Sequence, residues 1–273
     1  MAGTQDRSIL AFDEVTVRFD DRAVLDRVSF ELHRGESLVL LGEAGSGKTV
    51  LLKTALGLIR ADGGRVYLFG EDVTEATEQQ WYHLRARMGV LFQEGGLFDS
   101  LSIEDNVAYP LLNQDSLRCE EEEMARRVEQ SLEFVELGHT LEKFPSELSG
   151  GMRRRVGIAR AIVTEPELLL YDSPTAGLAP ITSHPIMALI IKGRYVRRAT
   201  TVIVTHRYQD GEMLTRYRHD AALGRLAPAQ ENGSGPRTHY IVLRGGRVVF
   251  DGSQAEMESA TDPYVANFAR RPE

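Results

Sequence analysis

The chain contains a single cysteine, no long apolar run and no excess of positive charge, and each absence excludes a class of protein. Cys119 has no second thiol for an internal disulfide and no metal-ligand neighbours in the sequence, which excludes a disulfide-stabilised fold. No apolar run approaches the roughly 18 residues that span a bilayer, and no hydrophobic export segment follows residues 1–7. The net charge of −8 argues against nucleic acid as a partner, because phosphate backbones bind basic surfaces. We therefore expect a protein of the reducing cytoplasm.

The sequence does contain enough core-forming residues for a large domain, and one strong motif. Of its 273 residues 42% are hydrophobic and 26% are charged, which is typical of a globular protein. The stretch Gly42–Thr49 matches the phosphate-binding pattern G-x-x-x-x-G-K-[ST] at every fixed position. A short apolar run over 37–41 precedes it, and apolar residues at helical spacing follow from Val50 to Leu58. A strand, a glycine loop and a helix are the context that this motif requires.

This motif predicts a site for a nucleoside triphosphate with Mg²⁺. Its glycines let successive backbone N–H groups curl around phosphate oxygens, and the N-terminus of the following helix adds partial positive charge. Lys48 is placed to reach the β- and γ-phosphates, and the hydroxyl of Thr49 is placed to ligate Mg²⁺. The residues expected to hold the nucleotide here are Gly42, Glu43, Ala44, Gly45, Ser46, Gly47, Lys48 and Thr49.

Stretches in which apolar residues have β-type spacing alternate along the chain with stretches in which they have helical spacing. Residues 8–35 alternate in the β manner, and a further hairpin is expected over 64–70. The pattern from about 96 to 147 is helical and acidic, whereas 225–238 is rich in Gly, Pro and Asn and is expected to be an exposed loop. Three more β-type runs alternate with helices, at 168–171, 201–205 and 240–243. This alternation predicts a mostly parallel sheet that is buried on both faces.

Two polar motifs flank the helical stretch from about 96 to 147, one just before it and one just after it. Gln93 carries an amide that could contact Mg²⁺ or an attacking water, although a solvated glutamine is far commoner. Ser149, Gly150 and Gly151 open a helix and so present N–H groups and a hydroxyl to an anion. A helix N-cap without any ligand has the same sequence.

Two more polar residues end predicted strands. Asp172 follows the apolar run 168–171, where a carboxylate is placed to hold Mg²⁺ through water. His206 ends the run 201–205, at an edge where a γ-phosphate could lie.

In this order, the motifs resemble those of the nucleotide-binding subunits of ABC transporters over roughly residues 8–255. The resemblance implies an α/β fold of the P-loop NTPase class, with a RecA-like, mostly parallel core sheet and an antiparallel β part at the N-terminus. It also implies a helical subdomain inserted at about 96–160, and leaves 256–273 as a C-terminal extension.

The same resemblance implies the ligands and the roles of residues. ATP would be the nucleotide, with Phe19 stacked on adenine and Gln93 and Asp172 beside Mg²⁺. His206 would be the switch histidine. Two copies would enclose ATP head to tail, so that Ser149, Gly150 and Gly151 of one copy complete the site of the other.

A finer resemblance rests on three stretches, Phe92–Leu111, Leu148–Arg155 and Asp262–Phe268. Together they look like the ATPase subunits of Mla/Mce-type lipid transporters. This implies a membrane permease as partner, a peripheral position on the cytoplasmic face of the inner membrane, and indirect contact with a periplasmic Mce-type lipid-binding protein. The apolar residues Leu97 and Phe98, on a glycine-rich loop, are expected either to meet the permease or to pack into the lobe itself.

Two positions depart from the family pattern at the place where hydrolysis occurs. Ser173 stands where the family has a glutamate, and loss of a general base typically costs about 10²- to 10⁴-fold in rate. Ala179 stands where the family has an aspartate. Two interpretations stay open. The chain is a working transport ATPase in which Gln93, Glu94 or His206 positions the water, or it is an ATP-binding regulatory or structural subunit with very slow hydrolysis.

Overall fold

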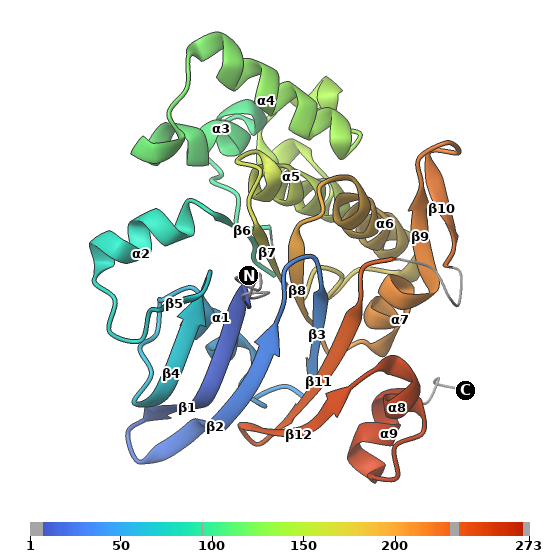
Figure 1. Ribbon diagram of the computed structural model, residues 1–273. Helices are drawn as coiled ribbons and strands as arrows, with labels where there is room; N and C mark the ends of the chain where they lie inside the picture. The colour runs from blue at the N-terminus through green and yellow to red at the C-terminus, as the bar shows by residue number, and fades with distance from the viewer. Residues whose placement is uncertain (1–7, 94, 230–234, 270–273) are drawn as a thin grey trace, which may run out of the picture.

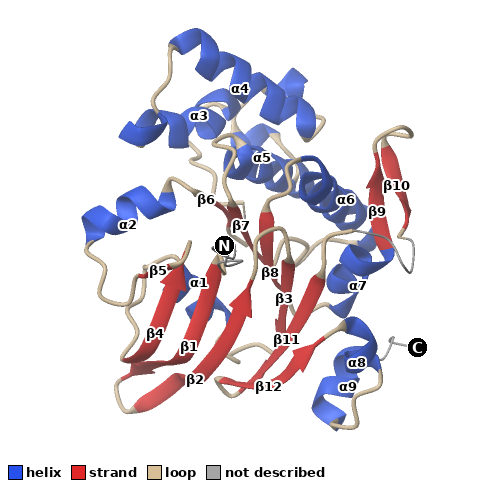
Figure 2. Ribbon diagram, viewed as in Figure 1, coloured by secondary structure: helices blue, strands red, loops and turns tan. Residues whose placement is uncertain are grey.

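The computed structural model describes residues 8–93, 95–229 and 235–269, and over these residues the strands form three sheets. Figures 1 and 2 show helices packed on a mixed sheet core, with a smaller antiparallel sheet beside it. The strands are β1 (Leu10–Phe19), β2 (Arg22–Leu32), β3 (Ser37–Gly42), β4 (Gly63–Leu68), β5 (Glu71–Asp72), β6 (Met88–Leu91), β7 (Leu168–Asp172), β8 (Thr200–Val204), β9 (Tyr217–Asp220), β10 (Arg225–Pro228), β11 (Thr238–Arg244) and β12 (Arg247–Gly252). The α-helices are α1 (Lys48–Ala55), α2 (Glu78–Arg85), α3 (Ile103–Asn113), α4 (Glu121–Phe134), α5 (Gly150–Ile162), α6 (Pro180–Val196), α7 (Tyr208–Arg216), α8 (Gln254–Glu258) and α9 (Pro263–Ala269).

The six-stranded sheet has the order β12-β11-β3-β8-β7-β6, and its ladders are parallel except between β11 and β12. Every residue of β3, β7 and β8 is buried. Alternate side chains enter two different core clusters, as in β3, where Val39 and Leu41 join one cluster and Leu38 and Leu40 join the other. Burial on both faces explains why these strands are continuously apolar in the sequence.

The four-stranded sheet, in the order β2-β1-β4-β5, is antiparallel throughout. Its inward-facing residues, among them Phe12, Val15 and Leu25, belong to the same core cluster as Leu38 and Leu40 of β3. The expected fold class is therefore confirmed: an α/β protein with a mostly parallel core sheet and an N-terminal antiparallel part.

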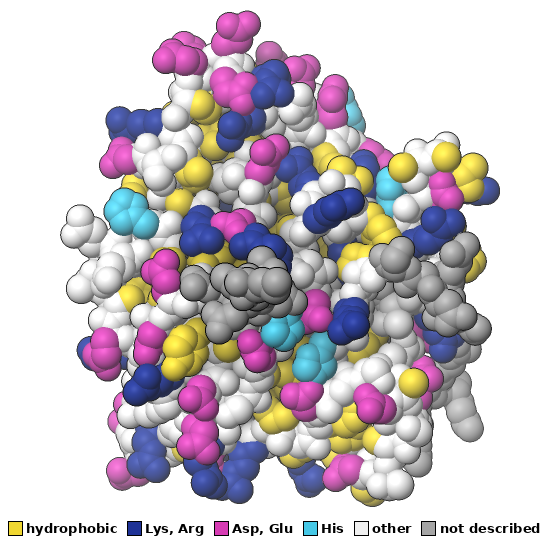
Figure 3. All heavy atoms as spheres, viewed as in Figure 1, with side chains coloured by type: hydrophobic (Ala, Val, Ile, Leu, Met, Phe, Trp, Pro, Cys, Tyr) yellow, Lys and Arg dark blue, Asp and Glu magenta, His cyan; other side chains and the backbone are white. Residues whose placement is uncertain are grey.

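Helices α3, α4 and α5 lie between β6 and β7 in the chain, pack against one another, and form one end of the molecule (Figure 1). Acidic side chains gather at that end over α4 (Figure 3), whose first turn is Glu121–Glu123. Negative charge in a first turn stabilises the helix N-terminus. Within the described ranges, no helix is both long enough and apolar enough to cross a membrane. At the other end of the chain, α8 spans the boundary expected at 255–256.

The prediction of a loop over 225–238 is wrong for its first four residues and for Thr238, which begins β11. Arg225–Pro228 form β10, which pairs with β9 in a hairpin that projects beside α6 and α7 (Figure 1). The carboxylate of Asp220 accepts hydrogen bonds from the N–H groups of Ala222 and Leu223, both at 3.1 Å, and so closes the turn. Residues 230–234 of the predicted loop lie outside the described residues.

One buried cation joins the elements behind the parallel sheet. Arg194, on α6, is only 2% exposed and donates hydrogen bonds to the carbonyl of Leu214 (2.7 Å), the carbonyl of Arg237 (2.9 Å) and the hydroxyl of Thr238 (2.8 Å). Desolvation lowers the pKa of Arg194 to about 10, so the group stays charged at neutral pH. It ties α6 to the end of α7 and to the start of β11.

Candidate nucleotide-binding site

The phosphate loop occupies the turn between β3 and α1. β3 ends at Gly42, and α1 begins at Lys48 after a loop with positive φ angles at Gly45 (+77°) and Gly47 (+105°). At Gly47, an added Cβ would lie 2.8 Å from the carbonyl oxygen of Val24, so both backbone angle and space require glycine there. Nothing lies within 4 Å of the position of a Cβ at Gly45, which leaves that side of the loop open. The expected context of strand, loop and helix is confirmed.

The ammonium group of Lys48 lies inside this loop. Its Nζ donates to the carbonyl oxygens of Gly42 and Glu43, both at 2.7 Å, and to the hydroxyl of Ser46 at 3.3 Å. Burial lowers the pKa of Lys48, and the nearby charges of Asp172 and Glu43 oppose that effect. Over the described residues, no carboxylate forms an ion pair with Lys48. A partly desolvated cation surrounded by loop amides suits a phosphate group.

Asp172 ends β7 at the same edge of the sheet and is 7% exposed. Burial raises the pKa of its carboxyl group, while the hydrogen bond from Ser173 and the charge of Lys48 lower it. The Ser173 hydroxyl donates to Asp172 Oδ1 at 3.0 Å, and the Ser173 backbone N–H donates to the carbonyl of Val204 at 2.7 Å. Ser173 therefore contacts the Asp172 carboxylate and also joins the ends of β7 and β8.

His206 is exposed just beyond β8, at the edge where Asp172 ends β7. Asp210, which no pattern in the sequence singles out, lies four residues further along and is 2% exposed. Its Oδ2 accepts hydrogen bonds from the hydroxyls of Thr175 and Thr205, both at 2.7 Å. Burial raises the pKa of Asp210, and these hydroxyls lower it. Asp210 thus links the segment after Asp172 to the segment that carries His206.

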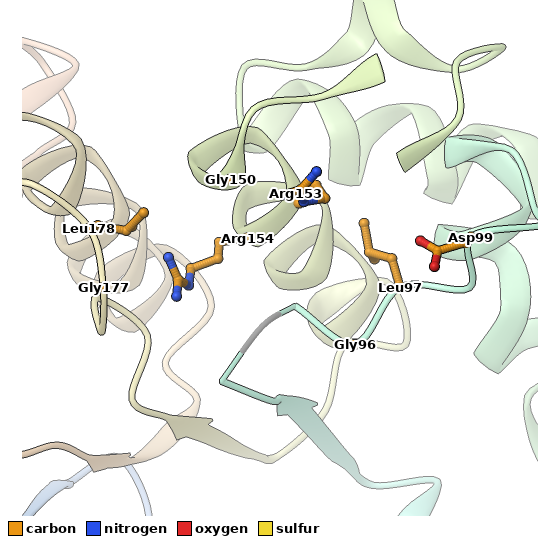
Figure 4. Close-up of a pocket in the computed structure, with 8 residues that line it drawn as sticks. All are labelled: Gly96, Leu97, Asp99, Gly150, Arg153, Arg154, Gly177 and Leu178. Atoms are coloured by element: carbon orange, nitrogen blue, oxygen red, sulfur yellow. The ribbon is translucent and has the colours of Figure 1, made fainter. Parts of the chain in front are cut away.

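Gln93 is exposed after β6, and its main chain is held by α5. Arg154 Nε donates to the carbonyl of Gln93 at 3.1 Å, and Arg154 Nη2 donates to the carbonyl of Ala176. Beside this bridge lies a pocket of about 560 Å³, which Figure 4 shows with Arg154 extending from α5 toward Gly177. The pocket is lined by Gly96, Leu97, Asp99, Gly150, Arg153, Arg154, Gly177 and Leu178. No local pattern in the sequence predicts this bridge, because the carbonyls that Arg154 contacts lie far from it along the chain.

The remaining predicted site residues lie apart from the phosphate loop. Ser149 caps α5 by accepting a hydrogen bond from Met152 N–H at 3.3 Å, as its sequence predicts. Across the described part of the chain, no hydrogen bond or ion pair joins Ser149, Gly150 or Gly151 to the phosphate loop. Phe19 ends β1 with 49% of its surface exposed. Glu94 lies outside the described residues.

Comparison with known proteins decides the family. The sequence profile described as "ABC transporter" matches residues 25–176, which include the phosphate loop, the helical lobe and the end of β7. The chain belongs to the ABC transporter ATP-binding family.

Relatives and solved structures agree with this assignment. The chain is 39% identical over 192 residues to the "Probable ribonucleotide transport ATP-binding protein mkl" of Mycobacterium leprae (strain TN), covering 70% of this chain and 55% of that protein. It is 37% identical over 198 residues to the "Methionine import ATP-binding protein MetN" of Rhizobium johnstonii, covering 72% and 54%. The chain thus spans about half the length of these curated relatives.

Among structures, the chain is similar to an ATP-binding cassette, MJ0796, described as a dimer in a post-hydrolysis state with ADP and Pi. The TM-score is 0.73 at 26% identity, with 89% of this chain and 98% of that one covered. It is also similar to cbiO1 from Clostridium perfringens, with a TM-score of 0.75 at 25% identity and coverage of 96% and 94%.

The first prediction concerns Lys48. Replacement by alanine is expected to weaken Mg-ATP binding by about one to two orders of magnitude, because a charge-assisted contact to phosphate is lost. Folding should change little, since the hydrogen bonds of Lys48 Nζ are made to residues of the loop itself. Calorimetry with Mg-ATP measures the first effect and thermal melting the second. Lys53→Ala, an exposed lysine on the same helix, is the matched control. Unchanged affinity in Lys48→Ala would contradict the assignment of the loop.

Proposed function

We propose that this chain is the ATP-binding subunit of a transporter and couples ATP binding and hydrolysis to lipid transport through a membrane permease. The observation that carries the nucleotide assignment is Lys48, a desolvated cation held by loop carbonyls without a paired carboxylate among the described residues. Residues 8–255 would form the ATP-binding domain, with a helical subdomain at about 96–160. The chain would lie on the cytoplasmic face of the inner membrane, bound to the permease.

The roles proposed for the site residues follow from their positions. The loop from Gly42 to Thr49 would hold the phosphates of ATP, with Thr49 and Asp172 positioned for Mg²⁺ and Gln93 beside it. When bound, Mg²⁺ neutralises charge on the phosphate oxygens. Asp172 must be ionised for this role, and the hydrogen bond from Ser173 favours its ionised form. His206 would contact the γ-phosphate, and Phe19 would stack on adenine.

Hydrolysis is where two proposals compete. In the first, the chain is a working ATPase in which Gln93 or His206 positions the water, since both side chains are exposed beside the site. In the second, it is an ATP-binding regulatory or structural subunit. The second is favoured by Ser173, whose hydroxyl donates a hydrogen bond to Asp172 and has no basic character with which to activate water.

The second prediction separates these two proposals. If the missing carboxylate limits hydrolysis, Ser173→Glu is expected to raise ATP turnover by up to about 10²- to 10⁴-fold, with Mg-ATP affinity nearly unchanged. Ser173→Gln introduces a side chain of the same shape as glutamate but without a basic group, so it should not raise ATP turnover. Adding Ala179→Asp should increase turnover more than additively if it also improves alignment of the site. Turnover of about 1 s⁻¹ or faster in the wild type, with no effect of Ser173→Glu, would show that another group activates the water.

An ATP-dependent homodimer is the proposed active form. The Ser149–Gly151 segment opens a helix of 13 residues, and Gly150 has nothing within 4 Å of the position of a Cβ. A partner's phosphate could therefore approach its free N–H groups. This segment has no polar contact with the phosphate loop of its own chain over the described residues, which suits a role in the partner's site.

The third prediction tests that dimer. Ser149→Arg places a bulky cation where the partner's nucleotide would sit, so Mg-ATP should no longer convert the monomer to a dimer in size-exclusion chromatography with light scattering. Ser146→Arg, an exposed position just before α5, makes the same change in size and charge and should still dimerise. Normal ATP-driven dimerisation of Ser149→Arg would show that this segment does not complete the partner's site.

The helical lobe offers a surface for the permease. Phe98 is 40% exposed and its ring centroid lies 4.5 Å from that of Tyr109, while Leu112, one turn along α3, is 48% exposed. Buried Asn106 fixes the loop, accepting from Phe98 N–H (2.8 Å) and donating to the Phe98 carbonyl (3.0 Å). Leu97, by contrast, is partly buried against the core cluster that contains Val39 and Leu41. Of the expected pair, only Phe98 is therefore available to contact the permease. A rigid, exposed apolar patch of this kind suits a protein partner.

The fourth prediction is that Phe98→Asp releases the chain from membranes without loss of ATP binding, because a charge would be buried against the permease. Fractionation of membranes and calorimetry measure the two properties. Leu58→Asp, which alters an exposed leucine just after α1, should stay membrane-bound. Retention of Phe98→Asp at the membrane would exclude this patch as the docking surface.

The cargo has three candidate classes. Phospholipid is proposed from the stretches Phe92–Leu111, Leu148–Arg155 and Asp262–Phe268, whereas the names of the two relatives above point to ribonucleotide or methionine. ATPase activity of the purified complex with its permease, stimulated by phospholipid but not by the other two, would support the lipid assignment and an indirect Mce-type partner. Stimulation by methionine or a ribonucleotide would replace it.

A further inference from the structure

A side-chain hydroxyl occupies the point where the phosphate loop leaves the sheet. The parallel ladder between β3 and β11 ends at the pair Gly42 and Leu243. Just beyond it, the hydroxyl of Tyr264 accepts a hydrogen bond from the N–H of Glu43 at 3.3 Å and donates one to the carbonyl of Leu243 at 3.1 Å. The hydroxyl thus joins the two strands through a side chain, one residue past the point where their backbones pair directly.

The ring that carries this hydroxyl is fixed independently of the loop. Helix α9 is anchored by Val265, which is 1% exposed and belongs to the same core cluster as Val39 and Leu41 of β3. The guanidinium of Arg244 lies over the Tyr264 ring at 4.9 Å from its centroid, and the ring of Phe268 meets it edge-on at 5.4 Å. The ring position is therefore set by α9 and β11, and the hydroxyl transmits that position to the loop.

The loop residues that Tyr264 contacts are those that hold Lys48. Lys48 Nζ donates to the carbonyls of Gly42 and Glu43, which flank the N–H bonded by Tyr264. The peptide between Gly42 and Glu43 is thus held from both sides. Without the hydroxyl, this peptide keeps the contact of its carbonyl with Lys48 but loses the one of its N–H, so more of the loop must be ordered when nucleotide binds, which lowers affinity.

The C-terminal helices also contact the other side of the site. Tyr208, the first residue of α7 and two residues after His206, donates to Glu258 of α8 at 2.6 Å. Gln254 of α8 donates to the Tyr208 hydroxyl and to Glu258, both at 2.8 Å. α8 and α9 therefore pack on the two elements that would contact the phosphates of a bound nucleotide.

We infer that Tyr264 is a positioning residue for the phosphate loop, so that nucleotide affinity depends on docking of the C-terminal helix α9. This inference rests on the proposed function, because it requires that the loop binds a nucleotide.

The fifth prediction is tested with two tyrosines in the full-length chain. Tyr264→Phe keeps the ring and removes only the hydroxyl, and it is expected to raise the Kd for Mg-ATP about three- to tenfold. Tyr82→Phe is the matched control, since the Tyr82 hydroxyl also donates to a carbonyl (Asn113, 2.9 Å) and accepts from an N–H (Asp115, 3.0 Å). Tyr82→Phe should leave the Kd for Mg-ATP unchanged, while it lowers the stability of the fold about as much as Tyr264→Phe does. Amide hydrogen exchange of the peptide containing Glu43 should quicken only in Tyr264→Phe.

Each outcome decides between the inference and the proposed function. Equal Kd values for wild type and Tyr264→Phe would overturn the inference and leave nucleotide binding in place. An equal rise of the Kd in Tyr264→Phe and Tyr82→Phe would do the same. Failure of the wild type to bind Mg-ATP, with Lys48→Ala indistinguishable from it, would overturn the proposed function and the inference with it.

Discussion

A sheet whose two faces are both covered can present polar chemistry only at the ends of its strands, and the site follows from that constraint. β3, β7 and β8 are buried along their whole length, and the polar residues of the site lie at the ends of these strands or shortly after them. Because the ladders are parallel, these strand ends meet at one edge. Lys48, Asp172 and His206 are brought near one another in this way, although they lie far apart in the sequence.

The electrostatics at this edge are a balance between burial and mutual attraction. Burial lowers the pKa of Lys48 and raises the pKa of Asp172. The attraction between the two charges has the opposite effect on each pKa, but it is the smaller of the two effects. The hydrogen bond from the Ser173 hydroxyl lowers the pKa of Asp172 and so favours its ionised form. A glutamate at the same position would remove that hydrogen bond and add a negative charge beside Asp172. The serine therefore favours ionised Asp172 at a place where a general base would serve hydrolysis.

Local patterns predicted part of this structure, and long-range side-chain contacts account for what they missed. The phosphate loop, the cap at Ser149 and the carboxylate that ends β7 each depend on a few adjacent residues, so the sequence alone predicts them. Asp210, Arg154 and Tyr264 do not, because their partners lie 35, 22 and 221 residues away along the chain. The hairpin of β9 and β10 was missed for another reason: its turn depends on the side chain of Asp220, and its strands are short and partly exposed.

The strand order has a consequence for the timing of synthesis. β3, which leads into the phosphate loop and ends at Gly42, is made long before its neighbours in the sheet, β8 and β11, which begin at residues 200 and 238. A ribosome adds about 5–20 residues per second, so β3 waits roughly 10 s or more for its second neighbour. Until β8 has been made, this apolar strand has no partner on either edge, and until β11 has been made one edge stays open. Nascent chains with unpaired strand edges aggregate or bind chaperones. The phosphate loop is therefore made well before the strands that flank it in the sheet, and its surroundings are completed only when β11 has been added.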